Sequence, residues 1–77
     1  MQVQLESTTK IVNLVVDGVS VPARIWEGVT ATGIPCHAYI TRIAVAYDKD
    51  ASEFARELQE QRKPTPAVAA IPLSLIL

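Results

Sequence analysis

Two runs rich in valine and isoleucine flank Asp17-Gly18 within Lys10–Ile25, and each run places an apolar side chain at every second position. An Asp-Gly pair between such runs favours the type I′ turn of a two-residue β-hairpin, because both turn positions need positive φ. The turn sets the register. On one face it predicts three apolar pairs: Val16 with Val19, Leu14 with Val21, and Val12 with Ala23. The other face is mixed and pairs Val15 with Ser20, Asn13 with Pro22, and Ile11 with Arg24.

The segments on either side of this hairpin also have strand character. Met1–Thr9 alternates apolar and polar residues, and we expect it to be either flexible or a short edge strand. Gly28–Gly33 has glycine at both ends and is expected to be a loop. Ile34–Tyr47 predicts a long strand whose apolar positions change parity near Thr41. Either a β-bulge or a strand covered on both sides would explain this change.

A helix is predicted to begin after Asp50. Asp50 and Glu53 have the spacing of a capping box. The following apolar residues recur at the spacing of one helix face, namely Ala51, Phe54, Ala55 and Leu58. We expect the helix to end at Lys63, because the residue before Pro64 avoids helical geometry.

The C-terminal segment predicts one helical turn followed by either a fourth strand or a buried tail. Thr65 and Pro66 are typical of an N-cap and a first helical residue. Ile71–Leu77 is apolar enough to need a covering partner, so it pairs either within this chain or with another chain. The expected fold is α+β, a three-stranded antiparallel meander packed against one helix, and the C-terminal segment after the short turn is a candidate fourth strand. All 77 residues are expected to form a single small domain.

The composition narrows the class of protein. A hydrophobic content of 49% is typical of a globular chain and too high for intrinsic disorder. Seven basic and eight acidic residues give a net charge of −1, without the basic excess of a typical nucleic-acid-binding domain. Cys36 is the only cysteine, no signal-peptide pattern is present, and the apolar C-terminus is too short to span a bilayer. We therefore expect a cytoplasmic protein without membrane contact.

Cys36-His37 is the only neighbouring pair with evident catalytic chemistry. Adjacent strand residues point to opposite faces, so this thiol and imidazole would not meet. A metal site needs three or four ligands, and the chain has no second Cys or His. The acidic residues around the predicted helix fit capping and solvent exposure better than catalysis. We expect no enzyme activity, no metal, no cofactor and no small-molecule substrate.

The candidate binding residues lie on the predicted sheet, on the face opposite the core. They are Arg24, Trp26, His37 and Tyr39. Trp, Tyr and Arg are enriched at binding hot spots, because each buries a large area while keeping a polar group. The alternative is that Trp26 belongs to the core and Arg24 shields it from solvent.

These features favour a non-catalytic protein–protein interaction module. We expect a small accessory or inhibitory protein of a phage or mobile element, which binds and blocks a larger target or forms a dimer. The alternative is a small nucleic-acid-binding domain that uses the sheet face. Its phosphate contacts would come from four cations, Lys10, Arg24, Arg42 and Lys49. So few cations make this alternative the weaker one, because phosphate contacts dominate such affinity.

Overall fold

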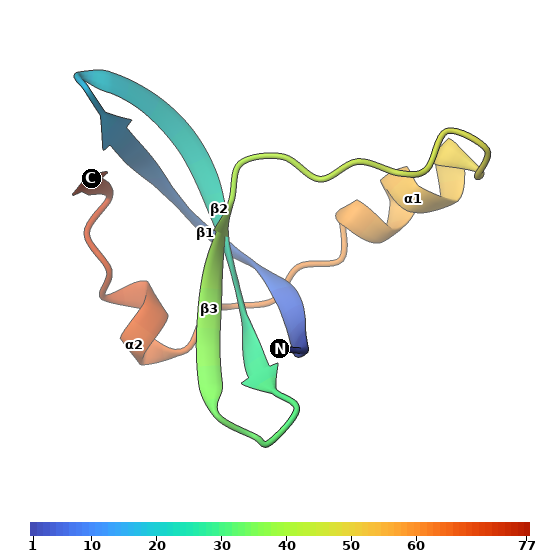
Figure 1. Cartoon of the computed structure of the whole chain (residues 1–77), viewed down its shortest axis with the longest axis horizontal. Helices are drawn as coiled ribbons and strands as arrows, with labels where there is room; N and C mark the ends of the chain where they lie inside the picture. Colours follow the sequence, from blue (N-terminus) through green and yellow to red (C-terminus); the bar gives the residue numbers. More distant parts are fainter.

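The computed structural model describes all 77 residues and is organised by a long β-hairpin (Figure 1). Strands β1 (Val3–Val16) and β2 (Val19–Thr30) run antiparallel and are joined by Asp17-Gly18. Both turn residues have positive φ, 50° at Asp17 and 77° at Gly18, as a type I′ turn requires. The strand pairing confirms the predicted register at all six positions between the turn and the Ile11–Arg24 pair.

Both hairpin strands extend further than the sequence pattern indicated. Residues 1–9 contribute to β1 from Val3 onward and pair with the far end of β2. The predicted loop Gly28–Gly33 is wrong in extent, because β2 continues to Thr30 and the chain reverses only over residues 31–33. The long β1 offers β2 a pairing partner as far as Thr30, and this pairing overrides the local preference of Gly28.

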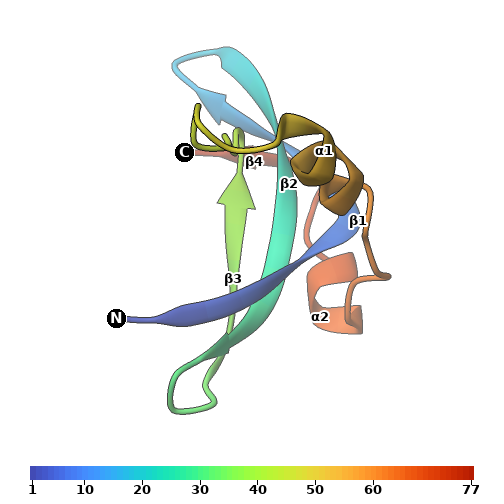
Figure 2. The ribbon, with the colours of Figure 1, turned by 90° about the vertical axis from the view of Figure 1, so that its right-hand side faces the viewer.

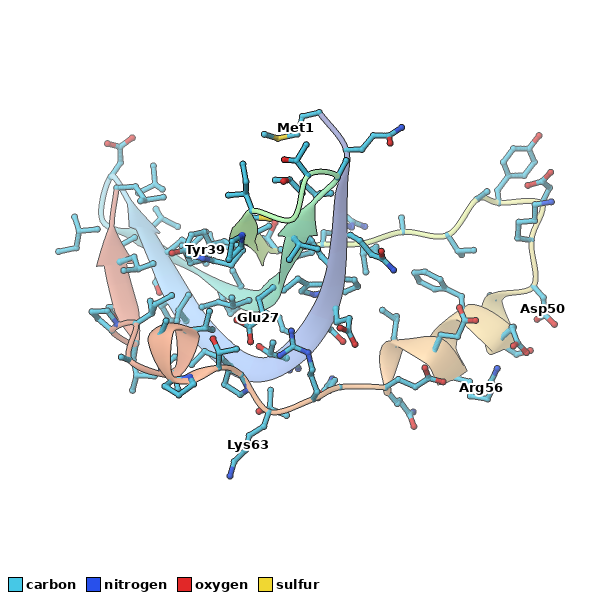
Figure 3. All side chains as sticks on the ribbon, turned by 90° about the horizontal axis from the view of Figure 1, so that it is seen from below. Met1, Glu27, Tyr39, Asp50, Arg56 and Lys63 are labelled. Atoms are coloured by element: carbon cyan, nitrogen blue, oxygen red, sulfur yellow. The ribbon has the colours of Figure 1, made fainter.

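A bulge in β1 bends the hairpin. Ser7 pairs with Trp26 and Ile11 pairs with Arg24, so three residues of β1 lie opposite Ile25 alone. Extra residues on one strand bend an antiparallel pair and increase its twist. The fully buried Thr8 holds the bulge, because its hydroxyl donates to the carbonyl oxygen of Ile25 at 2.6 Å. The sheet is curved, and we call its concave side the inner face (Figure 3).

Strand β3 (Pro35–Ile40) pairs antiparallel with β2 and ends well before the predicted Tyr47. The next hydrogen-bonded position of β2 after Arg24 is Pro22, which has no N–H to donate. The chain therefore leaves the sheet after Ile40. Residues 41–61, which we call the arm, extend away from the sheet and carry the first helix (Figure 1).

Helix α1 (Ala51–Leu58) begins where the sequence predicted. Asp50 is its N-cap, and the Asp50 carboxylate accepts a hydrogen bond from the Ser52 N–H at 2.9 Å. The helix ends at Leu58 rather than at Lys63, because Arg62 joins the edge of β1 instead. The Arg62 N–H donates to the Ser7 carbonyl at 3.1 Å, and the Arg62 carbonyl accepts from the Thr9 N–H at 3.0 Å.

The C-terminal segment folds onto the same chain. Helix α2 (Pro66–Ala69) begins at Pro66 with Thr65 as N-cap, and strand β4 (Ser74–Ile76) then pairs parallel with β1. The sheet order is β3-β2-β1-β4. The predicted α+β class is confirmed, with a three-stranded antiparallel meander and a fourth strand that makes the sheet mixed. None of the helices is both long and apolar enough to cross a membrane.

The core is small and lies on the inner face of the sheet. Only seven of the 77 residues are buried, and the apolar cluster consists of Val12, Ile25 and Val68. Val68 comes from α2, whereas α1 contributes no buried residue. The helix that closes the core is therefore the four-residue α2, and α1 stands beside the sheet (Figure 1).

Candidate interaction surface

The structure divides the four predicted binding residues between the two faces of the sheet. Facing residues of an antiparallel pair point to the same side. The register places Tyr39 beside Ile25 and His37 beside Glu27, which puts both aromatic side chains on the inner face. Arg24 and Trp26 point to the opposite, outer face. The expectation of one shared face is therefore wrong.

The apolar residues of β3 account for this difference. Cys36, Ala38 and Ile40 are apolar and share one parity, so strand alternation by itself predicts that they face the core and that His37 and Tyr39 face away from it. In the structure they lie beside Gly28, Trp26 and Arg24, on the outer face. The register across the turn at 31–33 determines this choice. Both parities of β3 carry side chains that can be buried, so the hydrophobic pattern alone does not distinguish them.

Arg24 and Trp26 line a groove of about 250 Å³ between the sheet and the arm. Ile40, Ile43 and Leu58 contribute apolar walls. Trp26 is half-buried there. The Arg24 guanidinium donates to the Thr8 carbonyl at 2.8 Å and so stabilises the β1 bulge. Both side chains thus have structural contacts within the chain.

His37 and Tyr39 make few contacts with the rest of the chain. The two rings meet edge to face, with centroids 5.3 Å apart, and His37 Nε2 lies 3.1 Å from the Tyr39 hydroxyl. Tyr39 is 38% exposed, and His37 is also exposed. Figure 3 shows Tyr39 and Glu27 on the inner side of the curved sheet. The side chains of His37 and Tyr39 are therefore accessible on the inner face, next to the unpaired edge of β3.

The inner face also holds a buried carboxylate that the hydrophobic pattern does not predict. Glu27 is 6% exposed and accepts hydrogen bonds from Arg62 Nη1 at 2.7 Å, the Thr65 N–H at 2.7 Å and the Thr65 hydroxyl at 2.8 Å. Burial raises the pKa of this carboxyl. The bonds from Thr65 and Arg62, with the charge of Arg62, outweigh burial and hold the pKa below its usual value. Glu27 follows Ile25 at the core parity of β2, and this position was the one signal available in the sequence.

The contacts of Glu27 indicate a structural role. They join β2 to the segment that leads into α2, and no buried side-chain nitrogen or oxygen of the protein lacks a hydrogen-bond partner. Cys36 and His37 lie on opposite faces of β3, so they do not form a nucleophile–base pair. No three side chains among His, Cys, Asp and Glu are grouped closely enough to hold a metal ion.

The four cations proposed for phosphate contact do not all lie on one surface. Arg24 and Arg42 line the outer groove, but Arg24 is bonded to the Thr8 carbonyl. The Lys10 ammonium donates to the carbonyl oxygen of Ala69 in α2 at 3.1 Å. Lys49 precedes α1 on the arm. Nucleic-acid binding remains a prediction that this arrangement does not strengthen.

The chain exposes many apolar side chains. Fourteen large hydrophobic residues are exposed, and several of them gather at the hairpin end and the C-terminus. On the inner face these include Val16, Val19 and Val21, which continue the core side of β1 and β2 beyond the reach of α2. The two outer strands of the sheet, β3 and β4, each leave one edge unpaired.

Comparison of the chain with protein-family models, with curated proteins and with solved structures finds no match.

Proposed function

We propose that this chain is a non-catalytic protein-interaction module that completes its fold by binding another polypeptide, as an accessory or inhibitory protein that either blocks a larger target or forms a dimer. One observation supports this above all. The solvent-accessible surface area of the protein is 5838 Å², whereas a folded monomer of its mass is expected to have about 4,600 Å². The excess is larger than the roughly 800 Å² that each partner buries in a standard interface.

The exposed surface has the chemistry that drives association. Val16, Val19 and Val21 share the inner face with the buried Val12 and Ala23, yet they are 45%, 62% and 39% exposed. Exposed apolar clusters of this kind mark interaction sites, because burial removes apolar area from water. A partner over the hairpin end would extend the core that α2 covers only in part.

The open shape of the chain also supports binding. The radius of gyration is 13.8 Å, whereas a compact chain of this length is expected to have about 11.5 Å. The arm accounts for part of this difference, because it lies away from the sheet and α1 has no buried residue (Figure 1). Of the four residues expected to bind a partner, His37 and Tyr39 are the exposed pair, and we retain them as contact residues.

Light scattering during size-exclusion chromatography, combined with small-angle X-ray scattering, tests this proposal. We expect a folded oligomer whose mass is at least twice the 8.4 kDa of one chain. A monomer with a radius of gyration near the compact value would contradict the proposal, because the excess surface would then be buried within the chain. A monomer that keeps a radius near 13.8 Å would assign the surface to a different protein chain.

A further inference from the structure

Strand β3 forms one edge of the sheet (Figure 2). Its register with β2 identifies the backbone groups that point away from β2. The Thr30 N–H donates to the Ile34 carbonyl at 2.9 Å, so this facing pair is hydrogen-bonded. Hydrogen-bonded and non-hydrogen-bonded pairs alternate along an antiparallel ladder. Ala38 and the other even-numbered residues of β3 therefore bond to β2. The N–H and C=O groups of His37 and Tyr39 point away from β2, toward the unpaired edge.

This edge lacks the features that usually prevent strand pairing. Sheet edges are commonly protected by charged side chains, by proline or by a bulge. The six residues of β3, PCHAYI, include no Lys, Arg, Asp or Glu. The proline stands at the first position and leaves the rest of the edge open. The edge is short but regular, and it is able to accept another strand.

We propose that a second copy of this chain adds its own β3 to this edge, antiparallel and about a two-fold axis at Ala38. This inference rests on the proposed function and names the partner as a copy of the same chain. Two identical strands related by a two-fold axis across the edge must run antiparallel, and each contributes the same groups to the interface. The two four-stranded sheets would then form one continuous sheet of eight strands.

The register follows from which outward groups can be satisfied. With the axis at Ala38, His37 faces Tyr39 of the second copy, and their N–H and C=O groups exchange four hydrogen bonds across the interface. With the axis at His37, Tyr39 would face Pro35, which has no N–H to donate. With the axis at Tyr39, His37 would face Thr41, which lies outside the strand. Only the axis at Ala38 satisfies every outward group of both central residues from within β3.

The facing side chains are also compatible in this register. On the inner face, His37 and Tyr39 of one copy lie beside Tyr39 and His37 of the other, which forms two aromatic pairs. On the outer face, Cys36 lies beside Ile40 and the two Ala38 side chains face each other. Aromatic and apolar cross-strand pairs stabilise sheets, and no like charges meet.

Disulfide trapping tests the register. In the double variant Cys36→Ser/Ala38→Cys, the two new thiols face each other at a non-hydrogen-bonded pair, with Cα atoms about 4.5 Å apart. This distance lies within the range for a disulfide. Mild oxidation is expected to give a covalent dimer. The matched control Cys36→Ser/His37→Cys should not link, because its thiols are two residues out of register.

A proline variant tests the backbone pairing itself. His37→Pro removes an outward N–H that β2 does not use, so the chain should stay folded by circular dichroism. His37→Ala removes the same side chain but keeps the N–H. We expect His37→Pro to weaken dimerisation about tenfold or more relative to His37→Ala, because each copy loses one hydrogen bond at the interface.

The outcomes separate this inference from the proposed function. An oligomer that is insensitive to His37→Pro, or in which Ala38→Cys links no better than His37→Cys, would overturn the β3 pairing and leave the interaction module intact. A monomer that keeps the extended radius of gyration would also exclude self-pairing and leave binding to a different protein. A compact monomer would overturn both.

Discussion

Glu27 stands at a position of β2 where strand alternation calls for an apolar side chain. Ala23 and Ile25 precede it at the same parity, and both are almost fully buried. Burying a carboxylate is costly unless its oxygens are bonded. Arg62 and Thr65 supply those bonds. They lie 35 and 38 positions after Glu27 in the chain. The carboxylate thus fixes where the C-terminal segment docks on the sheet.

We expect Glu27→Gln to destabilise the fold by about 2 kcal/mol at neutral pH, because Arg62 loses the nearer of its two carboxylate partners, Glu27 rather than Glu6, and one Thr65 bond is weakened. Urea denaturation of both proteins measures the difference. Folding lowers the pKa of Glu27, so its contribution is fully present above the ordinary value of 4.5 and declines as pH falls through the lower pKa of the folded state. The difference between the two proteins should therefore narrow in acid. A difference that stays constant from neutral to acid pH would contradict the assigned role of the carboxylate.

Gly28 is required by a close approach of two backbones. A Cβ built there would fall on the carbonyl oxygen of Gln4 and within 2.9 Å of its carbonyl carbon. Gly33 differs, because its φ is +88° and a Cβ there would meet nothing within 4 Å. One glycine is thus needed for space and the other for its backbone conformation.

We expect Gly28→Ala to cost about 3 kcal/mol or more, because two strands would have to separate. Gly33→Ala should cost only about 1–2 kcal/mol, from the left-handed backbone conformation alone. Thermal and urea denaturation of the two variants provide the comparison. Equal losses would show that β1 and β2 are not this close at Gly28.

At the scale of elements, the two helices exchange the roles that their sequences indicated. Helix α1 has the apolar stripe of a core-covering helix, yet none of its residues is buried. Helix α2 has four residues and supplies Val68, which packs with Val12 and Ile25. Two connections produce this result. Pro22 of β2 has no N–H for the next pair with β3, so β3 ends and the arm leaves the sheet. Arg62 then bonds to the edge of β1, which places the following residues beside the inner face.

This exchange predicts different effects for two truncations. Val68→Ala should destabilise the protein by about 2 kcal/mol, because it opens a cavity in the only apolar cluster. Phe54→Ala, on the stripe of α1, removes more atoms but should cost no more than about 1 kcal/mol. Denaturation midpoints measured side by side test this order. A larger loss at Phe54 would mean that α1 covers the sheet in solution.

At the scale of the whole molecule, the protein folds around a core that is small for its surface. Four apolar residues are buried, and fourteen large hydrophobic residues remain exposed. Chains of this size have little stability to spare, since they bury only about 60% of their unfolded surface. Association would supply apolar burial that the isolated chain lacks.

Coupling between folding and association makes stability depend on concentration. We expect the midpoint of thermal unfolding of the wild type to rise by several degrees when the protein concentration is raised a hundredfold, because mass action favours the associated folded state. The His37→Pro variant should show little change over the same range. Circular dichroism at two concentrations measures both. A concentration-independent midpoint for the wild type would exclude folding coupled to self-association.

The sequence alone determined the features that depend on neighbouring residues. The φ preferences of Asp17-Gly18 define the turn and, through it, the register of the hairpin. Asp50 and Thr65-Pro66 mark where two helices begin. The tertiary structure decided the features that depend on distant residues. These are the inward orientation of His37 and Tyr39, the contacts of Glu27, and the packing of α2 rather than α1 against the core. These features arise from strand pairing across a bulge and from contacts more than thirty residues apart, for which the local pattern has no counterpart.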